Sequence, residues 1–281
     1  MIKTLIPSAI HVQVASFREA VSLANAHGFG GLDFNIKELA DAIDTTGMSE
    51  VRSVFEQAGV KPAVFGLPVE WRQDEEKFQI DLAGLPRLAK AASDLGCYRT
   101  ATWVLSGSND RPTEENRAFH IARFGPVARI FADYGIALGL EFIGPKTIRD
   151  SLKYPFEYTC FGMLDLAKEI GPNVGLLFDV WHQYTSGGSV SEISKLTADN
   201  VVYVHLNDAP SGVEIDKQVD NRRELPGATG VIPAKEMLTA LVGIGYTGPA
   251  GVEPFNEALG KLPSNDAKLS AVMDSINKVW P

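Results

Sequence analysis

Cysteine is scarce in this sequence: Cys97 and Cys160 are the only two among 281 residues. Two isolated thiols exclude a disulfide-stapled scaffold, and their spacing does not match a cysteine-based metal site. Such usage is typical of proteins from a reducing compartment. We therefore expect a cytoplasmic location and two ordinary packed cysteines.

Basic residues are outnumbered as well, with 26 Lys and Arg against 35 Asp and Glu and a formal net charge of −9. No cluster of Lys and Arg is present, which argues against a nucleic-acid partner and against an anionic membrane surface. A single pocket can still bind a phosphorylated substrate. Long apolar runs are also missing, and the first seven residues lack a cleavage site, so we expect neither a signal peptide nor a membrane span.

The sequence has no linker, no low-complexity segment and no G-x-G-x-x-G loop after its first apolar segment. What recurs is an alternation of short β-branched segments with longer amphipathic ones. The predicted strands span residues 5–11, 31–36, 60–67, 98–105, 136–142, 174–180, 201–207 and 249–254. The predicted helices span residues 16–28, 37–58, 75–95, 114–134, 156–170, 189–198, 233–244 and 265–279. Eight such units predict a (β/α)8 TIM barrel, one domain over residues 1–281, rather than a doubly wound sheet.

Polar residues lie near the ends of four successive predicted strands. Side chains alternate between the two faces of a strand, so Glu141 shares a face with Ala137 and Gly139, while the large apolar residues take the other face. The same alternation places Asp179, His205 and Glu253 on the inward faces of the next three strands. Because enzyme sites in such barrels lie at the carboxyl ends of the strands, we expect the four side chains to meet in the barrel mouth.

Three carboxylates in one mouth repel one another unless a cation neutralises them. Each residue alone is more often a cap or a hydrogen-bonded surface group, but four in matching phase on adjacent strands favour a shared site. Three oxygen ligands and one imidazole suit Mn²⁺, Mg²⁺ or Co²⁺, with Zn²⁺ also compatible. We predict one divalent metal ion, with Mn²⁺ as the first choice.

Five motifs between residues 139 and 255 occur in a fixed order. They are Gly139-Leu140-Glu141-Phe142, Phe178-Asp179-Val180-Trp181-His182, Val204-His205-Leu206-Asn207-Asp208, the segment 221–227 (NRRELPG) followed by 230–233 (GVIP), and Val252-Glu253-Pro254-Phe255. Together they resemble the xylose isomerase-like TIM-barrel superfamily, whose members include sugar phosphate isomerases and epimerases, ketose epimerases, and inosose isomerases and dehydratases. The resemblance covers the whole chain and is specific for the superfamily, but it does not specify the substrate.

The resemblance implies the same four metal ligands and an isomerase or epimerase acting on a sugar, a sugar phosphate or a keto-inositol. A proton would be removed next to a carbonyl, and the metal would stabilise the resulting enediolate. Glu141 and Glu253 would be the catalytic pair that takes and returns this proton from different sides. The expected partner is a small carbohydrate, and a homo-oligomer is compatible with the resemblance.

His182 and one of two neighbouring arginines are expected to bind substrate. The resemblance makes His182 a donor to a substrate oxygen, although an exposed loop histidine is the simpler alternative. Only one of two adjacent side chains should face the pocket, and we choose Arg222, leaving Arg223 to pair with a surface carboxylate.

Three further residues are weaker substrate-binding candidates. Trp103 could stack on a sugar ring or belong to the core. Lys146 could bind a phosphate, act as a base or remain solvated, and Glu70 follows the third predicted strand at the barrel mouth.

Three alternatives keep the barrel and change its role. A dehydratase or lyase would share the first proton abstraction and then expel a hydroxyl group. An endonuclease acting at abasic sites would need more histidines and a basic groove, which five histidines and a net charge of −9 do not supply. A sugar-binding barrel without activity would be expected to lack one of the ligands, and none is missing.

Overall fold

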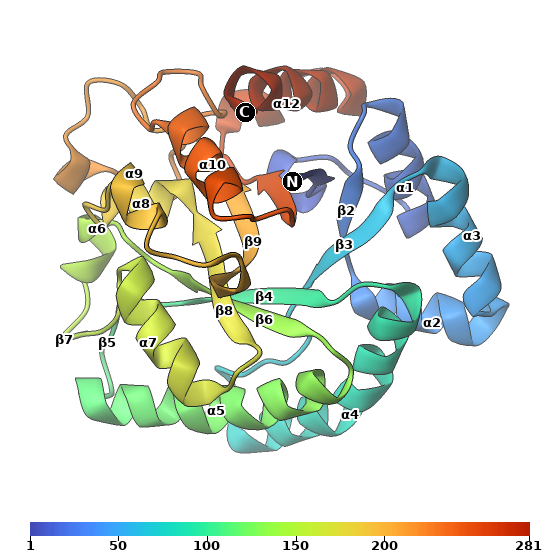
Figure 1. The fold of residues 1–281 in the computed structure, drawn as a ribbon, viewed down its shortest axis with the longest axis horizontal. Helices are drawn as coiled ribbons and strands as arrows, with labels where there is room; N and C mark the ends of the chain where they lie inside the picture. Colours follow the sequence, from blue (N-terminus) through green and yellow to red (C-terminus); the bar gives the residue numbers. More distant parts are fainter.

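Eight parallel strands close into a barrel in the computed structural model, which describes residues 1–281 (Figure 1). The barrel strands are β1 (Ile2–Leu5), β2 (Gly31–Phe34), β3 (Lys61–Gly66), β4 (Arg99–Val104), β6 (Ala137–Phe142), β8 (Val174–Asp179), β9 (Val201–Leu206) and β10 (Pro249–Val252). They neighbour one another in the order β1-β10-β9-β8-β6-β4-β3-β2. Strands consecutive along the chain are therefore adjacent, and the predicted single-domain (β/α)8 TIM barrel is confirmed.

Helices surround this barrel (Figure 1). They are α1 (Phe17–Ala26), α2 (Ile36–Thr46), α3 (Met48–Ala58), α4 (Glu75–Leu95), α5 (Thr113–Asp133), α6 (Lys146–Arg149), α7 (Cys160–Ile170), α8 (Val180–Thr185), α9 (Val190–Ile193), α10 (Ala234–Gly243), α11 (Glu257–Gly260) and α12 (Asn265–Val279). The predicted helix 37–58 is wrong as a single element. Gly47, with a φ of 91°, separates α2 from α3, because this backbone conformation cannot continue a helix.

Two other predicted elements need correction. The predicted strand 5–11 is wrong, since β1 ends at Leu5 and a 3-10 turn follows at Ser8–Ile10. Pro7, which has no backbone N–H to donate to a strand ladder, precedes this turn. The helix predicted at 189–198 is only α9, and a second 3-10 turn follows it at Ala198–Asn200.

The apolar core has two parts. The larger part lies between the barrel and its helices, and a small cluster fills the barrel interior with Ile6, Val64, Ala101, Leu177 and Tyr203. Leu177 and Tyr203 precede Asp179 and His205 by two residues, so the latter point to the same inward face. The inward phase predicted for these two strands is thus confirmed, and the interior cluster forms the floor below the barrel mouth.

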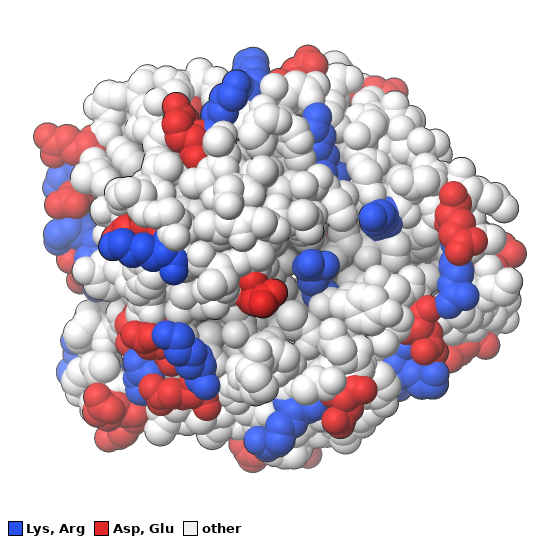
Figure 2. All heavy atoms as spheres, in the orientation of Figure 1, with Lys and Arg blue, Asp and Glu red and all other residues white.

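The two ends of the chain close the ring of helices. Parallel pairing of β1 with β10 completes the barrel, and His27 at the end of α1 lies 3.0 Å from Asp266 of α12. None of the helices combines the length and apolar character that crossing a bilayer requires. On the face shown in Figure 2, acidic and basic side chains are interspersed, and no continuous basic field covers it.

Acid should weaken the fold through His120, a side chain of α5 that is 96% buried among aromatic rings. Desolvation lowers its pKa from 6.5 to about 4. Below pH 6.5 the unfolded chain binds a proton that the folded chain does not, so stability falls until the pH approaches 4. We expect a loss of about 2–3 kcal/mol in the free energy of unfolding between pH 7.5 and pH 4.5 from this group.

The measurement is urea unfolding of the wild type and of His120→Phe at both pH values. Carboxylates titrate in both proteins and should contribute equally to the loss. On acidification, the wild type should therefore lose about 2–3 kcal/mol more unfolding free energy than the variant. Equal losses in the two proteins would show that His120 is not the responsible group.

Candidate metal centre

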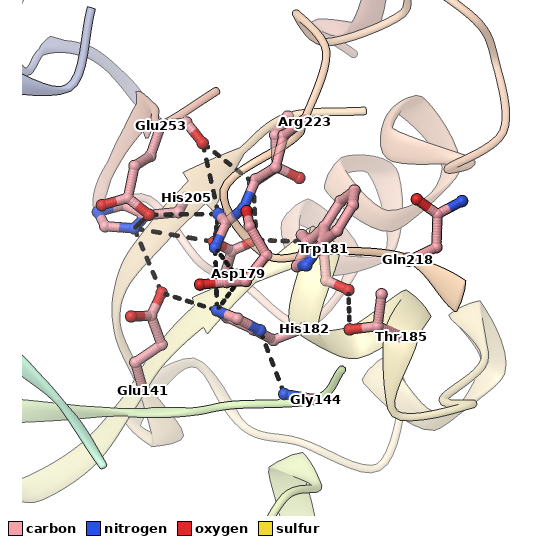
Figure 3. A network of polar contacts seen from close by, with 12 residues as sticks. Glu141, Gly144, Asp179, Trp181, His182, Thr185, His205, Gln218, Arg223 and Glu253 are labelled. Atoms are coloured by element: carbon pink, nitrogen blue, oxygen red, sulfur yellow. Dashed lines mark hydrogen bonds and ion pairs between the residues drawn. The ribbon is translucent and has the colours of Figure 1, made fainter. Parts of the chain in front are cut away.

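Four residues from four adjacent strands meet at the barrel mouth (Figure 3). Glu141 lies near the end of β6, Asp179 is the last residue of β8, His205 lies near the end of β9, and Glu253 follows β10 directly. One ligand atom from each side chain falls within 4.8 Å of all the others. The alternation along parallel strands thus brings together the four side chains that the sequence predicts to meet.

His205 occupies the middle of this group. Its Nδ1 atom lies 3.4 Å from Glu141 Oε1, 3.4 Å from Glu253 Oε2 and 4.0 Å from Asp179 Oδ2. Glu141, Asp179 and His205 are buried, and the Glu253 side chain is 21% exposed. The opening of the site to solvent is therefore on the side of Glu253.

The donor set fits a divalent cation. Glu141 Oε1 and His205 Nδ1 are buried without a hydrogen-bond partner, although such atoms normally have one. Desolvation and the nearby charge of Glu253 raise the pKa of Glu141 to about 8. Burial alone would lower the pKa of His205, but Glu253 and Glu141 raise it well above its usual value. A cation bound among these atoms would stabilise the carboxylates and pair with the free oxygen and nitrogen.

Arg223 is the buried cation beside this group. Its Nη1 donates to Asp179 Oδ2 at 2.8 Å and to Glu253 Oε2 at 3.2 Å, and its Nη2 donates to Asp220 at 2.7 Å. Burial opposes the charge of Glu253, but His205 and Arg223 hold its pKa below the usual value. The choice of Arg222 as the inward residue is wrong, because Arg222 is exposed and Arg223 is 2% exposed.

Further hydrogen bonds hold Asp179, and the chain segment that carries Arg223, in place. Asp179 Oδ1 accepts from the Trp181 amide at 2.6 Å and from Asn207 Nδ2 at 2.9 Å. Asp208 accepts four backbone N–H groups, those of Ala209, Thr229, Gly230 and Ile232. Asp208 thereby anchors the two ends of the segment 208–232, which carries Arg223 into the mouth.

His182 is not an exposed loop residue but a fully buried one, in the first turn of α8. Both ring nitrogens face donors, since the Gly144 amide lies 3.2 Å from Nδ1 and Arg223 Nη2 lies 3.2 Å from Nε2, and a neutral imidazole accepts at only one of them. Desolvation lowers its pKa to about 3, which keeps the ring neutral. Nε2 also lies 4.0 Å from Glu141 Oε1, so the ring is next to this carboxylate at the mouth.

The weaker candidates take different positions. Trp103 on β4 stands opposite Glu141 of β6 and shares the face of Ala101, which lies inside the barrel, so its ring lies at the mouth. Lys146 begins α6 and pairs with Asp150 in the same helix. Glu70 is exposed, and its backbone N–H donates to Asp81. The structure therefore brings Trp103, but not Lys146 or Glu70, to the four central residues.

Asp33 is a site residue that the sequence argument missed. It lies on β2, and the Tyr203 hydroxyl of the barrel floor donates to it at 3.4 Å. Desolvation raises its pKa to about 7, while His205 acts in the opposite direction. The signal was present, because Gly31 and Asp33 alternate with Leu32 and Phe34 as the ligands do on their own strands.

A comparison with known protein families identifies the family of this barrel. The family model described as "Xylose isomerase-like TIM barrel" matches residues 21–278. The chain belongs to this family. The barrel is thus a feature of the family.

Three individual proteins are similar to this chain at sequence identities of 19% to 27%. An inosose isomerase of Halalkalibacterium halodurans is 27% identical over 269 residues, covering 89% of this chain and 91% of the relative. A xylose isomerase domain protein of Alicyclobacillus acidocaldarius has a structure with a TM-score of 0.85 and 27% identity, covering 99% of this chain and 96% of that one. The IolI protein, whose structure contains a zinc atom, matches with a TM-score of 0.77 and 19% identity, covering 100% and 99%.

Proposed function

We propose that this protein is a divalent-metal-dependent isomerase or epimerase that acts on a sugar, a sugar phosphate or a keto-inositol. The observation that carries the proposal is the convergence of Glu141, Asp179, His205 and Glu253. Two of their buried atoms, Glu141 Oε1 and His205 Nδ1, have no hydrogen-bond partner. The relative named inosose isomerase supports this chemistry, and the zinc atom bound in the IolI structure supports a divalent metal ion. Mn²⁺ remains our first choice because three of the four ligands are carboxylates.

Glu141 and Glu253 are proposed to move the proton. They belong to β6 and β10, which β8 and β9 separate in the barrel, so they face the mouth from different sides. A carboxylate that binds the ion through one oxygen can accept or return a proton through the other. The ion, when bound, supplies positive charge where negative charge develops on the substrate oxygen next to the reacting carbon.

His182 and Arg223 are proposed to orient the substrate. The ring of His182 lies at the mouth between the Gly144 amide, next to Nδ1, and Arg223 Nη2, next to Nε2. Arg223 holds Asp179 and Glu253 through one nitrogen, and its second terminal nitrogen bonds Asp220. These contacts fix the direction of the carboxylates before the substrate enters, which lowers the cost of orienting them during the reaction.

The test is an incubation of the Mn²⁺-loaded protein with ketoses, inososes and 3-oxo sugars in deuterated water, followed by mass spectrometry. We expect deuterium to enter the position next to the carbonyl of one substrate class without loss of water. Incorporation accompanied by an unsaturated product would instead identify a lyase. Elemental analysis that finds no divalent metal, together with no deuterium in any substrate, would overturn the proposal.

A further inference from the structure

A cavity of about 240 Å³ is lined by residues that follow β3 and β4, and Trp103 connects it to the barrel mouth. Its lining includes the aromatic residues Trp71, Trp103 and Phe119, the arginines Arg72 and Arg111, and His120. Trp103, which stands opposite Glu141 across the β4–β6 pairing, is the wall nearest to the metal ligands. We call this space the side cavity, and none of the roles proposed above uses its charged residues.

The two arginines of the side cavity lie over aromatic rings. The guanidinium carbon of Arg72 is 4.1 Å from the centre of the Trp103 ring, and that of Arg111 is 3.8 Å from the centre of the Phe119 ring. Neither arginine forms a salt bridge, whereas Arg123 nearby pairs with a glutamate. Stacking occupies the faces of a guanidinium and leaves the N–H edges free, which is the arrangement that binds a carboxylate or a phosphate through two hydrogen bonds.

His120 adds an acceptor to the same cavity. Its Nδ1 bonds the Asn116 carbonyl oxygen at 2.7 Å, and since a carbonyl can only accept, Nδ1 carries the proton. Nε2 is then a lone pair without a partner on a side chain that is 96% buried. Asp110, in an exposed loop, is the single carboxylate of the lining, so two positive charges face one negative charge.

We propose that the side cavity binds an anionic group, a phosphate or a carboxylate, on the substrate whose reacting carbon lies at the metal centre. Arg72 and Arg111 would hold the anion, and His120 Nε2 would accept a hydrogen bond from a neighbouring hydroxyl group of the substrate. The carboxylates of the metal centre pair with Arg223 and with the ion, whereas Arg72 and Arg111 have no carboxylate partner, so the anionic end is drawn to the side cavity. The proposal extends the proposed function, since it names the class of sugar that the same site takes.

The test measures anion binding without metal or catalysis. The wild type is held in EDTA at constant ionic strength and titrated with inorganic phosphate or with acetate, and tryptophan fluorescence reports the environment of Trp103 under Arg72. We expect a saturable change with at least one anion. Replacing either arginine, as Arg72→Gln or Arg111→Gln, should raise the Kd about tenfold, the value of one charge-assisted hydrogen bond.

Arg129→Gln is the matched control, because Arg129 is an exposed arginine of α5 outside the cavity, and its Kd should stay at the wild-type value. Tighter binding of phosphate would assign a phosphorylated sugar, and tighter binding of acetate a sugar acid. No saturable change with either anion, or an unchanged Kd in both arginine variants, would overturn the proposal. Because EDTA is present throughout, this result is independent of whether deuterium exchange succeeds or fails.

Discussion

Glu253→Gln should remove most of the activity and most of the bound metal. Glutamine keeps the shape of the side chain but loses the charge, and its amide cannot carry the proton that we assign to this position. Positioned general acid–base groups contribute roughly 10²–10⁴-fold, and a weakened metal ligand adds to this loss. We therefore expect kcat/KM to fall by about 10³-fold or more. Elemental analysis of the purified variant should show less metal than the wild type.

Glu257→Gln is the control for this experiment. Glu257 lies four residues further along the chain, and its side chain is 90% exposed in α11. Removing its charge changes the net charge of the protein by the same amount without touching the site, so kcat/KM and metal content should stay close to wild type. If Glu253→Gln kept the metal and an activity within about tenfold of wild type, the assigned proton transfer would be wrong.

The site could be predicted from the sequence where regular geometry determines direction. In a strand, every second side chain points to the same face, and in a parallel barrel every strand ends at the same mouth. These two rules are sufficient to bring Glu141, Asp179, His205 and Glu253 together without knowledge of any long-range contact. The same alternation puts Asp33 of β2 on the face opposite to Leu32 and Phe34.

The sequence could not decide between Arg222 and Arg223, because no regular period governs the segment 208–232. Its path depends on the four backbone groups that the Asp208 carboxylate binds and on the single bridge between Asp208 and Glu224. Such contacts join residues up to 24 positions apart. The strand predicted at 5–11 failed for a local reason, since Pro7 cannot donate to a strand ladder and a 3-10 turn follows it.

Arg223→Gln should destabilise the metal-free protein by about 3–5 kcal/mol, which is typical when one partner of a buried ion pair is removed. The buried Asp179 and the partly exposed Glu253 would then lie next to Glu141 without the guanidinium that pairs with both of them. A divalent ion neutralises the same carboxylates, so Mn²⁺ should restore more unfolding free energy to the variant than it adds to the wild type. Urea unfolding in EDTA and in Mn²⁺ measures both quantities.

Arg222→Gln is the matched control one residue away. Its side chain is exposed, so the same change of charge should alter the free energy of unfolding by less than about 0.5 kcal/mol, with or without Mn²⁺. Equal effects of the two variants would mean that the net charge of the segment matters and the buried contacts of Arg223 do not. A large effect of Arg223→Gln that Mn²⁺ fails to reduce would instead indicate that the arginine supports the fold of segment 208–232 and does not share the carboxylates with an ion.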